Sequence, residues 1–356
     1  MALSVTSPSY AFTNRFPNIY VTGSAGKSLL FSVKLGGETL LEDETYIFNS
    51  IGMATIRFLG DLLEKHFYDN AYDVRHFLLS AVLTFKSESE TVEKTIPTYF
   101  LRSYVSTENL SPDAIRNRPL SRHSEKHTLP GVKEYVSFVS SSGSSVAASI
   151  TYLSGDNVLS KTVTLHSFGS SDLFTTVDVS EQVISGLLSA GEIPLEWSVY
   201  KSGYSGNGIK YILDKASSFP ATVFLYQTCY GGIESFLCRG ICKNEMQANR
   251  EIASLGGRSI ISKQTSARSY SVNTGYLDPE KQESLIDLLN CRNLMVLKGN
   301  TAVPAIINGE NVSMHNFRSK LPTAEFTYSH TERNLTEASF NESEGVFDYT
   351  FDNTFN

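Results

Sequence analysis

The segment at residues 23–28 reads Gly-Ser-Ala-Gly-Lys-Ser and ends like a phosphate-binding loop. In such loops, backbone N–H groups and the lysine hold phosphate oxygens at the start of a helix. The full motif also needs an earlier glycine, where Val21 and Thr22 stand, and the apolar residues 29–35 indicate a strand instead of a helix. We therefore predict a glycine turn, and no cofactor is expected.

Four cysteines and two histidines have the chemistry of zinc ligands. A structural zinc site usually has two close pairs of ligands, and here only Cys238 and Cys242 are close, while Cys229 and Cys291 stand alone. We predict packed, unreactive thiols, because cysteine often behaves as a small apolar residue. No metal site is expected.

His123 and His127 have the spacing of two ligands on one helix face. Their surroundings are polar and resemble a loop, and no third ligand is near. The sequence favours a solvated loop here.

Other signs of an enzyme are weak. There is no G-x-S-x-G elbow around a serine nucleophile. Pairs of carboxylates occur in any β protein of this size, so they do not single out a hydrolase. The single tryptophan, Trp197, lies in an expected strand and is predicted to be part of the core. The chain is predicted not to be an enzyme.

Charge and hydropathy exclude two further classes. The net charge is −7, and six acidic residues against one arginine lie beyond residue 331, so the rest of the chain is almost neutral. This is unlike the basic surface of a protein that binds nucleic acid sequence-specifically. No apolar run has the length of a membrane span. Residues 1–20 lack the basic start and apolar block of an export signal, which favours a protein made in the cytoplasm and not inserted in a membrane.

The dominant apolar period is two, which indicates strands. Ala54, Ile56 and Phe58 alternate with polar residues, and so do the apolar residues of 77–85. The same pattern predicts four more strands, at 146–153, 161–167, 221–228 and 324–330.

Turn and helix signals complete the mainly β pattern. The pairs Gly36-Gly37 and Asn308-Gly309 predict hairpin turns. A short helix is expected after Ser180, with Val183, Ile184, Leu187 and Leu188 on one face. The stronger helix signal is Asp278-Pro279, followed by an apolar stripe of Leu285, Ile286, Leu288 and Leu289.

These signals predict tandem β-sandwich-like domains followed by an α+β domain with one amphipathic helix and extended terminal arms. The arm at the C-terminus is acidic and aromatic, and Phe347, Tyr349 and Phe351 alternate in it. Such a segment can add as a strand to the sheet of a neighbour, so these three residues are candidate assembly contacts. The expected divisions are an arm at 1–20, a sandwich at 21–106, a linker or excursion loop at 107–128, a second sandwich at 129–215, an α+β domain at 216–331 and an arm at 332–356.

The last third of the chain resembles tail or baseplate structural proteins of phages and prophages of Bacteroides-type bacteria. The resemblance rests on a glycine-glycine-x-glutamate-x-phenylalanine strand, a turn into the helix, a valine-proline strand, an aromatic strand and an arginine-asparagine pair. In this sequence these are Gly231, Gly232, Glu234 and Phe236; Thr274, Gly275, Tyr276 and Leu277; Val303 and Pro304; Phe326 and Tyr328; and Arg333 and Asn334.

The resemblance implies a viral structural protein without catalytic residues, in a tail, baseplate or collar ring of a bacteriophage virion. Its partners would be copies of itself, as a homo-oligomer, and neighbouring virion proteins. The alternative is a bacterial surface carbohydrate-binding or adhesin module built from stacked sandwiches. That alternative predicts an export or lipoprotein signal, which the first residues lack.

Overall fold

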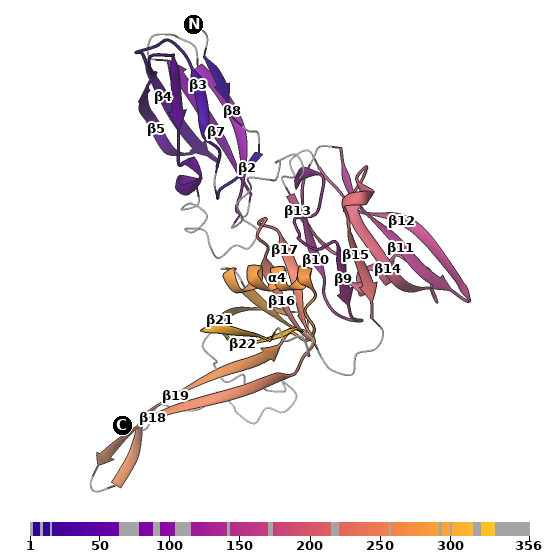
Figure 1. Ribbon diagram of the computed structural model, residues 1–356. Helices are drawn as coiled ribbons and strands as arrows, with labels where there is room; N and C mark the ends of the chain where they lie inside the picture. Colours follow the sequence, from indigo (N-terminus) through magenta and orange to yellow (C-terminus); the bar gives the residue numbers. More distant parts are fainter. Residues whose placement is uncertain are drawn as a thin grey trace, which may run out of the picture.

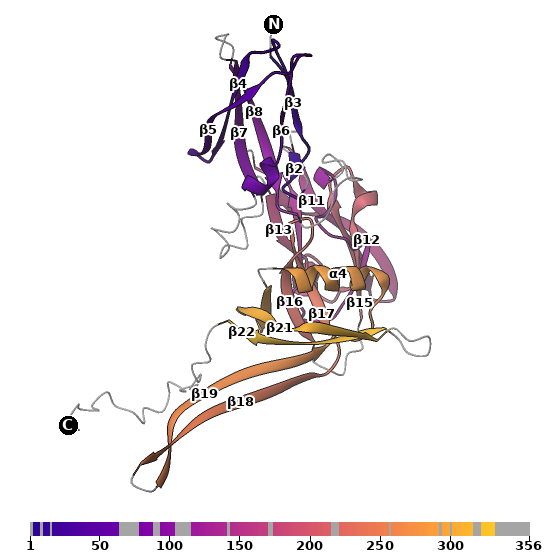
Figure 2. The same cartoon turned by 60° about the vertical axis from the view of Figure 1, so that its left-hand side comes forward.

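The computed structural model describes residues 3–7, 10–14, 16–63, 78–87, 93–103, 115–140, 143–169, 174–214, 221–255, 258–291, 294–299, 301–315 and 322–331. It is mainly β, with several sheets and few helices, and confirms the predicted fold class. Three β units follow one another along the chain (Figures 1 and 2). No helix in these ranges is long and apolar enough to cross a bilayer.

The first unit is a sandwich of a three-stranded and a five-stranded sheet, in the orders β1-β3-β6 and β2-β8-β7-β4-β5. One core of alternating apolar side chains fills the space between them, including Phe31, Leu83 and Phe85, all fully buried. The strands are β1 (Ser4–Thr6), β2 (Tyr10–Phe12), β3 (Ile19–Thr22), β4 (Ser28–Leu35), β5 (Glu38–Ile47), β6 (Met53–Ile56), β7 (Leu78–Ser87) and β8 (Glu93–Leu101).

Two expectations for this unit are wrong. The segment at 1–20 is not a free arm, because β1 and β2 pair with β3 and β8, and Leu3, Ala11 and Phe12 are buried. Strand β6 ends at Ile56, so Phe58 does not extend its apolar face. Phe58 has a φ of 59° and is 77% exposed.

Both glycine turns of this unit lead into strands. Gly36 and Gly37 have φ angles of 54° and 101°, and they join β4 to β5 as predicted. The turn at 23–28 leads from β3 into β4, and Gly26 has a φ of 72°. A strand therefore follows this segment, where a phosphate-binding loop would need the N-terminus of a helix.

The second unit has a five-stranded sheet, β12-β11-β14-β15-β9, and a two-stranded sheet, β10-β13. Trp197 lies in its core as predicted, 1% exposed and stacked on Tyr211. The elements are β9 (Glu125–Thr128), β10 (Tyr135–Val139), β11 (Ser145–Ser154), β12 (Asn157–Ser167), β13 (Phe174–Asp178), α3 (Glu181–Gly186), β14 (Ile193–Lys201), η1 (Ser205–Asn207) and β15 (Ile209–Leu213).

Strand β9 corrects the expected linker at 107–128. Its residues pair in parallel with β15, so residues 125–128 belong to the five-stranded sheet of the second unit. The alternation of exposed and buried residues in β9 is too short to detect in the sequence, because the strand has only four residues. Helix α3 starts after Ser180 as predicted, but of its expected face only Ile184 is fully buried.

The third unit is a seven-stranded sheet, β17-β16-β20-β21-β22-β19-β18, with helix α4 packed on β16 and β17. The core between helix and sheet includes Leu285, Leu288, Phe224 and Phe326. The elements are β16 (Thr222–Gln227), β17 (Ile233–Cys238), β18 (Cys242–Leu255), β19 (Arg258–Asn273), α4 (Pro279–Asn290), β20 (Leu294–Lys298), β21 (Thr301–His315) and β22 (Thr323–His330).

Helix α4 confirms the strongest helix prediction. The Asp278 side chain accepts a hydrogen bond from the N–H of Lys281 at 2.8 Å, and Pro279 opens the helix. The predicted stripe is narrower than expected, because Ile286 is 44% exposed while Leu285 and Leu288 are fully buried. Its neighbours Ser284 and Asp287 are buried instead, facing the second unit and the β16–β17 turn.

The hairpin predicted at Asn308-Gly309 is wrong. Strand β21 runs through this pair without turning, and its pairing with β22 shifts from Asn308↔Thr327 to Ser313↔Glu325. Residues 309–312 therefore stand opposite the single residue Phe326, and an irregular stretch of the pairing takes up the extra residues.

Candidate functional site

The segment at 115–128 lies between the second and third units and carries polar side chains into their contact. Lys126, on β9, is the centre of this contact. Its Nζ lies 3.0 Å from Glu134 Oε2 and 3.1 Å from Glu234 Oε1, and donates a hydrogen bond to the carbonyl of Ser235 at 2.8 Å. We call Lys126, Glu134 and Glu234 the ionic junction.

The ionic junction is sealed from solvent. Lys126 is 8% exposed, Glu134 not at all and Glu234 1%. Burial alone lowers the pKa of Lys126, but the two carboxylates outweigh it and raise that pKa, so the ammonium stays charged. Burial also raises the pKa of Glu134, against the opposing effect of Lys126. Removing one partner of a buried ion pair leaves a buried charge uncompensated, so these units are held in one orientation by mutually dependent groups.

His123 lies next to the ionic junction, and the expected solvated loop is wrong for it. It is 8% exposed, and its Nε2 is 2.7 Å from the Ser284 hydroxyl of α4. Burial, the larger cause, and the charge of Lys126 together lower its pKa to about 3. The ring is therefore neutral at pH 7 and joins α4 to the 115–128 segment by a hydrogen bond.

His127 is exposed, in contrast, and pairs with Asp214 at 3.1 Å. Partial burial acts to raise the pKa of Asp214, but hydrogen bonds from Arg239 and His127 outweigh it and lower that pKa. The two histidines lie on a segment that ends in a β-strand, and they contact different partners. They therefore do not share a ligand set.

We expect the stability of the protein to fall as the pH falls below 6.5. The unfolded chain binds a proton at His123 near pH 6.5, whereas the folded chain resists it down to about pH 3. Stability rises with pH wherever the unfolded state binds more protons, so this group costs up to about 1.4 kcal/mol for each pH unit below 6.5. Urea unfolding of the parent and of His123→Gln, at pH 7 and pH 5, measures this. The parent should lose more stability than the variant; equal losses would contradict a buried neutral His123.

The contacts from Ser284 to His123 and from His123 to Glu280 resemble those of a catalytic nucleophile, its base and the carboxylate that orients the base. The Ser284 hydroxyl meets the imidazole at 2.7 Å, and Glu280 Oε2 lies 3.9 Å from His123 Nδ1. A catalytic serine must also reach its substrate. Ser284 is 1% exposed, so this arrangement positions α4 rather than presenting a nucleophile to a dissolved substrate.

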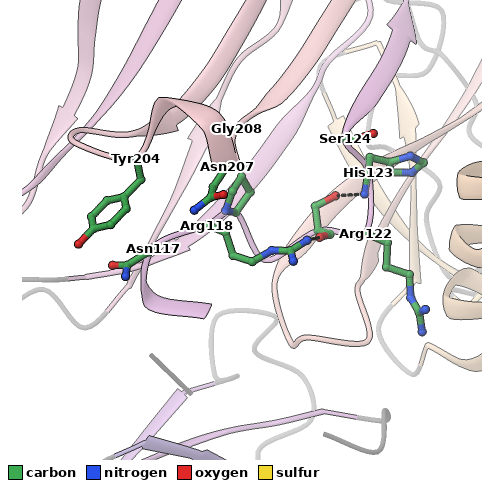
Figure 3. A pocket seen from close by; sticks show the side chains of 10 residues that line it. Asn117, Arg118, Arg122, His123, Ser124, Tyr204, Asn207 and Gly208 are labelled. Carbon is green, nitrogen blue, oxygen red and sulfur yellow. Dashed lines mark hydrogen bonds between the residues drawn. The ribbon is translucent and has the colours of Figure 1, made fainter. Parts of the chain in front are cut away.

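Two cavities flank His123. The larger, about 830 Å³, lies between β9, β17 and the start of α4, and Lys126, Arg239, Tyr276 and Lys281 line it. Arg239 pairs with Asp214 there, whereas the Lys281 ammonium donates to the backbone carbonyls of Thr274 and Tyr276. The smaller, about 330 Å³, has Tyr204 and Asn207 on one side and His123 and Ser124 on the other, with Arg118 between them (Figure 3).

The four cysteines are free and none forms a metal site in the described ranges. Cys229 and Cys238 are buried, as predicted for packed thiols, whereas Cys242 is exposed and Cys291 is partly so. Burial raises the pKa of Cys238 to about 12 and that of Cys291 to about 12. These thiols therefore carry little thiolate at neutral pH.

The residues that carry the phage resemblance are structural in this fold. Glu234 belongs to the ionic junction, and Phe236, Leu277, Phe326 and Tyr328 are buried in the third unit. The buried Thr274 hydroxyl accepts a hydrogen bond from the N–H of Ala324. Arg333 and Asn334 lie outside the described residues, as do the candidate assembly contacts Phe347, Tyr349 and Phe351.

Comparison with protein-family models finds no match for the chain, and a search of curated proteins finds none either.

One surface feature was missed by sequence reasoning. Strands β18 and β19 pair over 14 positions and form a long two-stranded ribbon that extends away from the rest of the third unit (Figures 1 and 2). We call residues 242–273 the ribbon. Its polar sequence has no clear apolar alternation, and the only available signal is the Gly256-Gly257 pair between the strands.

Proposed function

We propose that the chain is a non-enzymatic structural subunit of a phage virion, in a tail, baseplate or collar ring. The observation that carries this proposal is the ribbon, a pair of strands that leaves its own sheet and extends into space. A projecting strand pair offers backbone donors and acceptors to another chain, which is a common means of joining subunits. The resemblance of the last third of the chain supplies the choice of a tail or baseplate.

The contacts between the units support the same proposal. A small apolar cluster brings together Phe12 and Leu101 of the first unit, Leu120 and Val139 of the second and Tyr230 of the third. With the ionic junction, this cluster holds the three units in one relative orientation. A subunit that binds its neighbours through a projecting ribbon and a terminal segment needs units that keep one relative orientation.

We expect the protein to be present in purified phage particles in amounts similar to those of other tail proteins. Quantitative proteomics of particles from a producing strain measures this, with a non-structural phage protein as the negative control. Light scattering of the purified protein should also show an oligomer. Recovery of the protein only from host membrane fractions would contradict the proposal and favour a surface module.

A further inference from the structure

Within the part of the chain that the structure describes, no strand pairs with either side of the ribbon for most of its length. Strand β22 pairs with β19 only from Tyr270 to Asn273, and no described strand pairs with the outer edge of β18. The stretch from Arg258 to Ser269 and its partners on β18 is therefore a two-stranded structure on its own. Such a hairpin is at best marginally stable in water, so a further strand would stabilise it.

The ribbon also exposes apolar side chains at its outer end. Ile252 and Ile261 lie directly opposite each other on the two strands, 69% and 53% exposed. Across 242–273 the sequence has five basic and two acidic residues, a net charge of +3. A segment that covers this end should therefore be extended, apolar at alternate positions and acidic.

The C-terminal segment at 332–356 has each of these properties. It carries six acidic residues and one arginine, and Phe347, Tyr349 and Phe351 alternate with Asp348, Thr350 and Asp352. Its 25 residues span up to about 80 Å when extended, whereas the 14 residues of β18 need about 46 Å. The opposite net charges favour their encounter.

The path of β22 favours a neighbouring copy as the source of this segment. Pairing of β22 with β19 stops at Tyr328↔Tyr270, but pairing with β21 continues to His330↔Ala305. The N–H of Thr331 then donates to the carbonyl of Pro304 at 3.1 Å. Residue 331 therefore leaves the sheet on the β22 side of β19, whereas the outer edge of β18 lies on the far side of the ribbon. The following segment of the same chain would have to cross the ribbon to reach that edge.

We propose that the outer edge of β18 accepts the 332–356 segment of a neighbouring copy as an added strand, with Phe347, Tyr349 and Phe351 on the face of Ile252 and Ile261. Backbone hydrogen bonds supply the binding energy, and the aromatic side chains cover the isoleucines. This inference rests on the proposed function, because it requires copies of the chain to assemble.

Disulfide trapping between two full-length variants tests this. One carries Ile252→Cys and the other Tyr349→Cys, and both carry Cys242→Ser to remove the exposed native thiol. After mixing and mild oxidation, a disulfide-linked pair of the two variants is expected. Its yield should fall as salt rises from about 0.1 to 1 M, because the screening length shortens from about 10 to 3 Å. The matched control is Val158→Cys in place of Ile252→Cys, since Val158 is also exposed and lies on an edge strand.

The outcomes separate this inference from the proposed function. A yield no higher than with Val158→Cys would overturn the ribbon as the acceptor. A chain with both cysteines that forms only an internal disulfide would overturn the neighbouring copy as the source. In either case, an oligomer in light scattering and presence in phage particles would leave the proposed function standing.

Discussion

Replacing Lys126 with methionine should lower the free energy of unfolding by about 3–5 kcal/mol. The substitution leaves Glu134 and Glu234 buried at the contact between two units without their cation. Methionine keeps most of the volume of the aliphatic chain, so the loss reports the charge. Urea unfolding of the full chain, followed by tryptophan fluorescence of Trp197 in the second unit, measures it.

Two further variants make this test specific. Lys133 pairs with Asp178 at 3.0 Å at a partly exposed site, and Lys133→Met should cost about 1 kcal/mol or less. Adding Glu134→Gln and Glu234→Gln to Lys126→Met should recover part of the loss, because the buried charges are then removed together. Equal costs for Lys126→Met and Lys133→Met would show that the ionic junction does not hold the units together.

The second large effect is expected in α4. Leu285→Ala and Leu288→Ala should each cost about 2–5 kcal/mol, since both side chains are fully buried in the third core. Asp278→Ala removes the cap of the helix and should cost about 0.5–2 kcal/mol. Ile286→Ala is the matched control on the exposed face of the same helix and should change stability by about 0.5 kcal/mol or less.

The order of these costs is decisive, and urea melts of the full chain give it. A cap substitution more damaging than both leucine truncations would mean that α4 is not packed on β16 and β17 in solution. A costly Ile286→Ala would mean that the helix presents a different face.

Patterns within a few neighbouring residues correctly predicted strands and helices that depend mainly on those residues. Ala81, Leu83 and Phe85 alternate and are all fully buried, and Asp278-Pro279 opens the helix that it predicts. The Asn308-Gly309 prediction was wrong because the same pair suits a turn or an irregular stretch within a strand, and the pairing with β22 decides between them.

Local sequence patterns did not predict the ionic junction. Lys126 and His123 stand in a polar stretch, and their partners on β17 and α4 lie more than 100 residues away. Glu234 was the one accessible signal, because it is a carboxylate within the apolar strand Ile233–Cys238. A charge in a buried strand requires a partner, but the sequence does not say which lysine supplies it.

The spacing of the ionic junction along the chain also sets an order of events during synthesis. Glu134 follows Lys126 by 8 residues, whereas Ser235, whose carbonyl accepts another hydrogen bond from the lysine, follows it by 109. The second unit is complete only at Leu213, the end of β15, which pairs with β9. At about 5–20 residues per second, the ribosome needs roughly 1–4 s to go from there to Ser235. During this time the second unit can fold with its lysine and one glutamate already paired and still in contact with water. Strand β17, which buries them, is synthesised later, so the third unit folds against the already folded second unit.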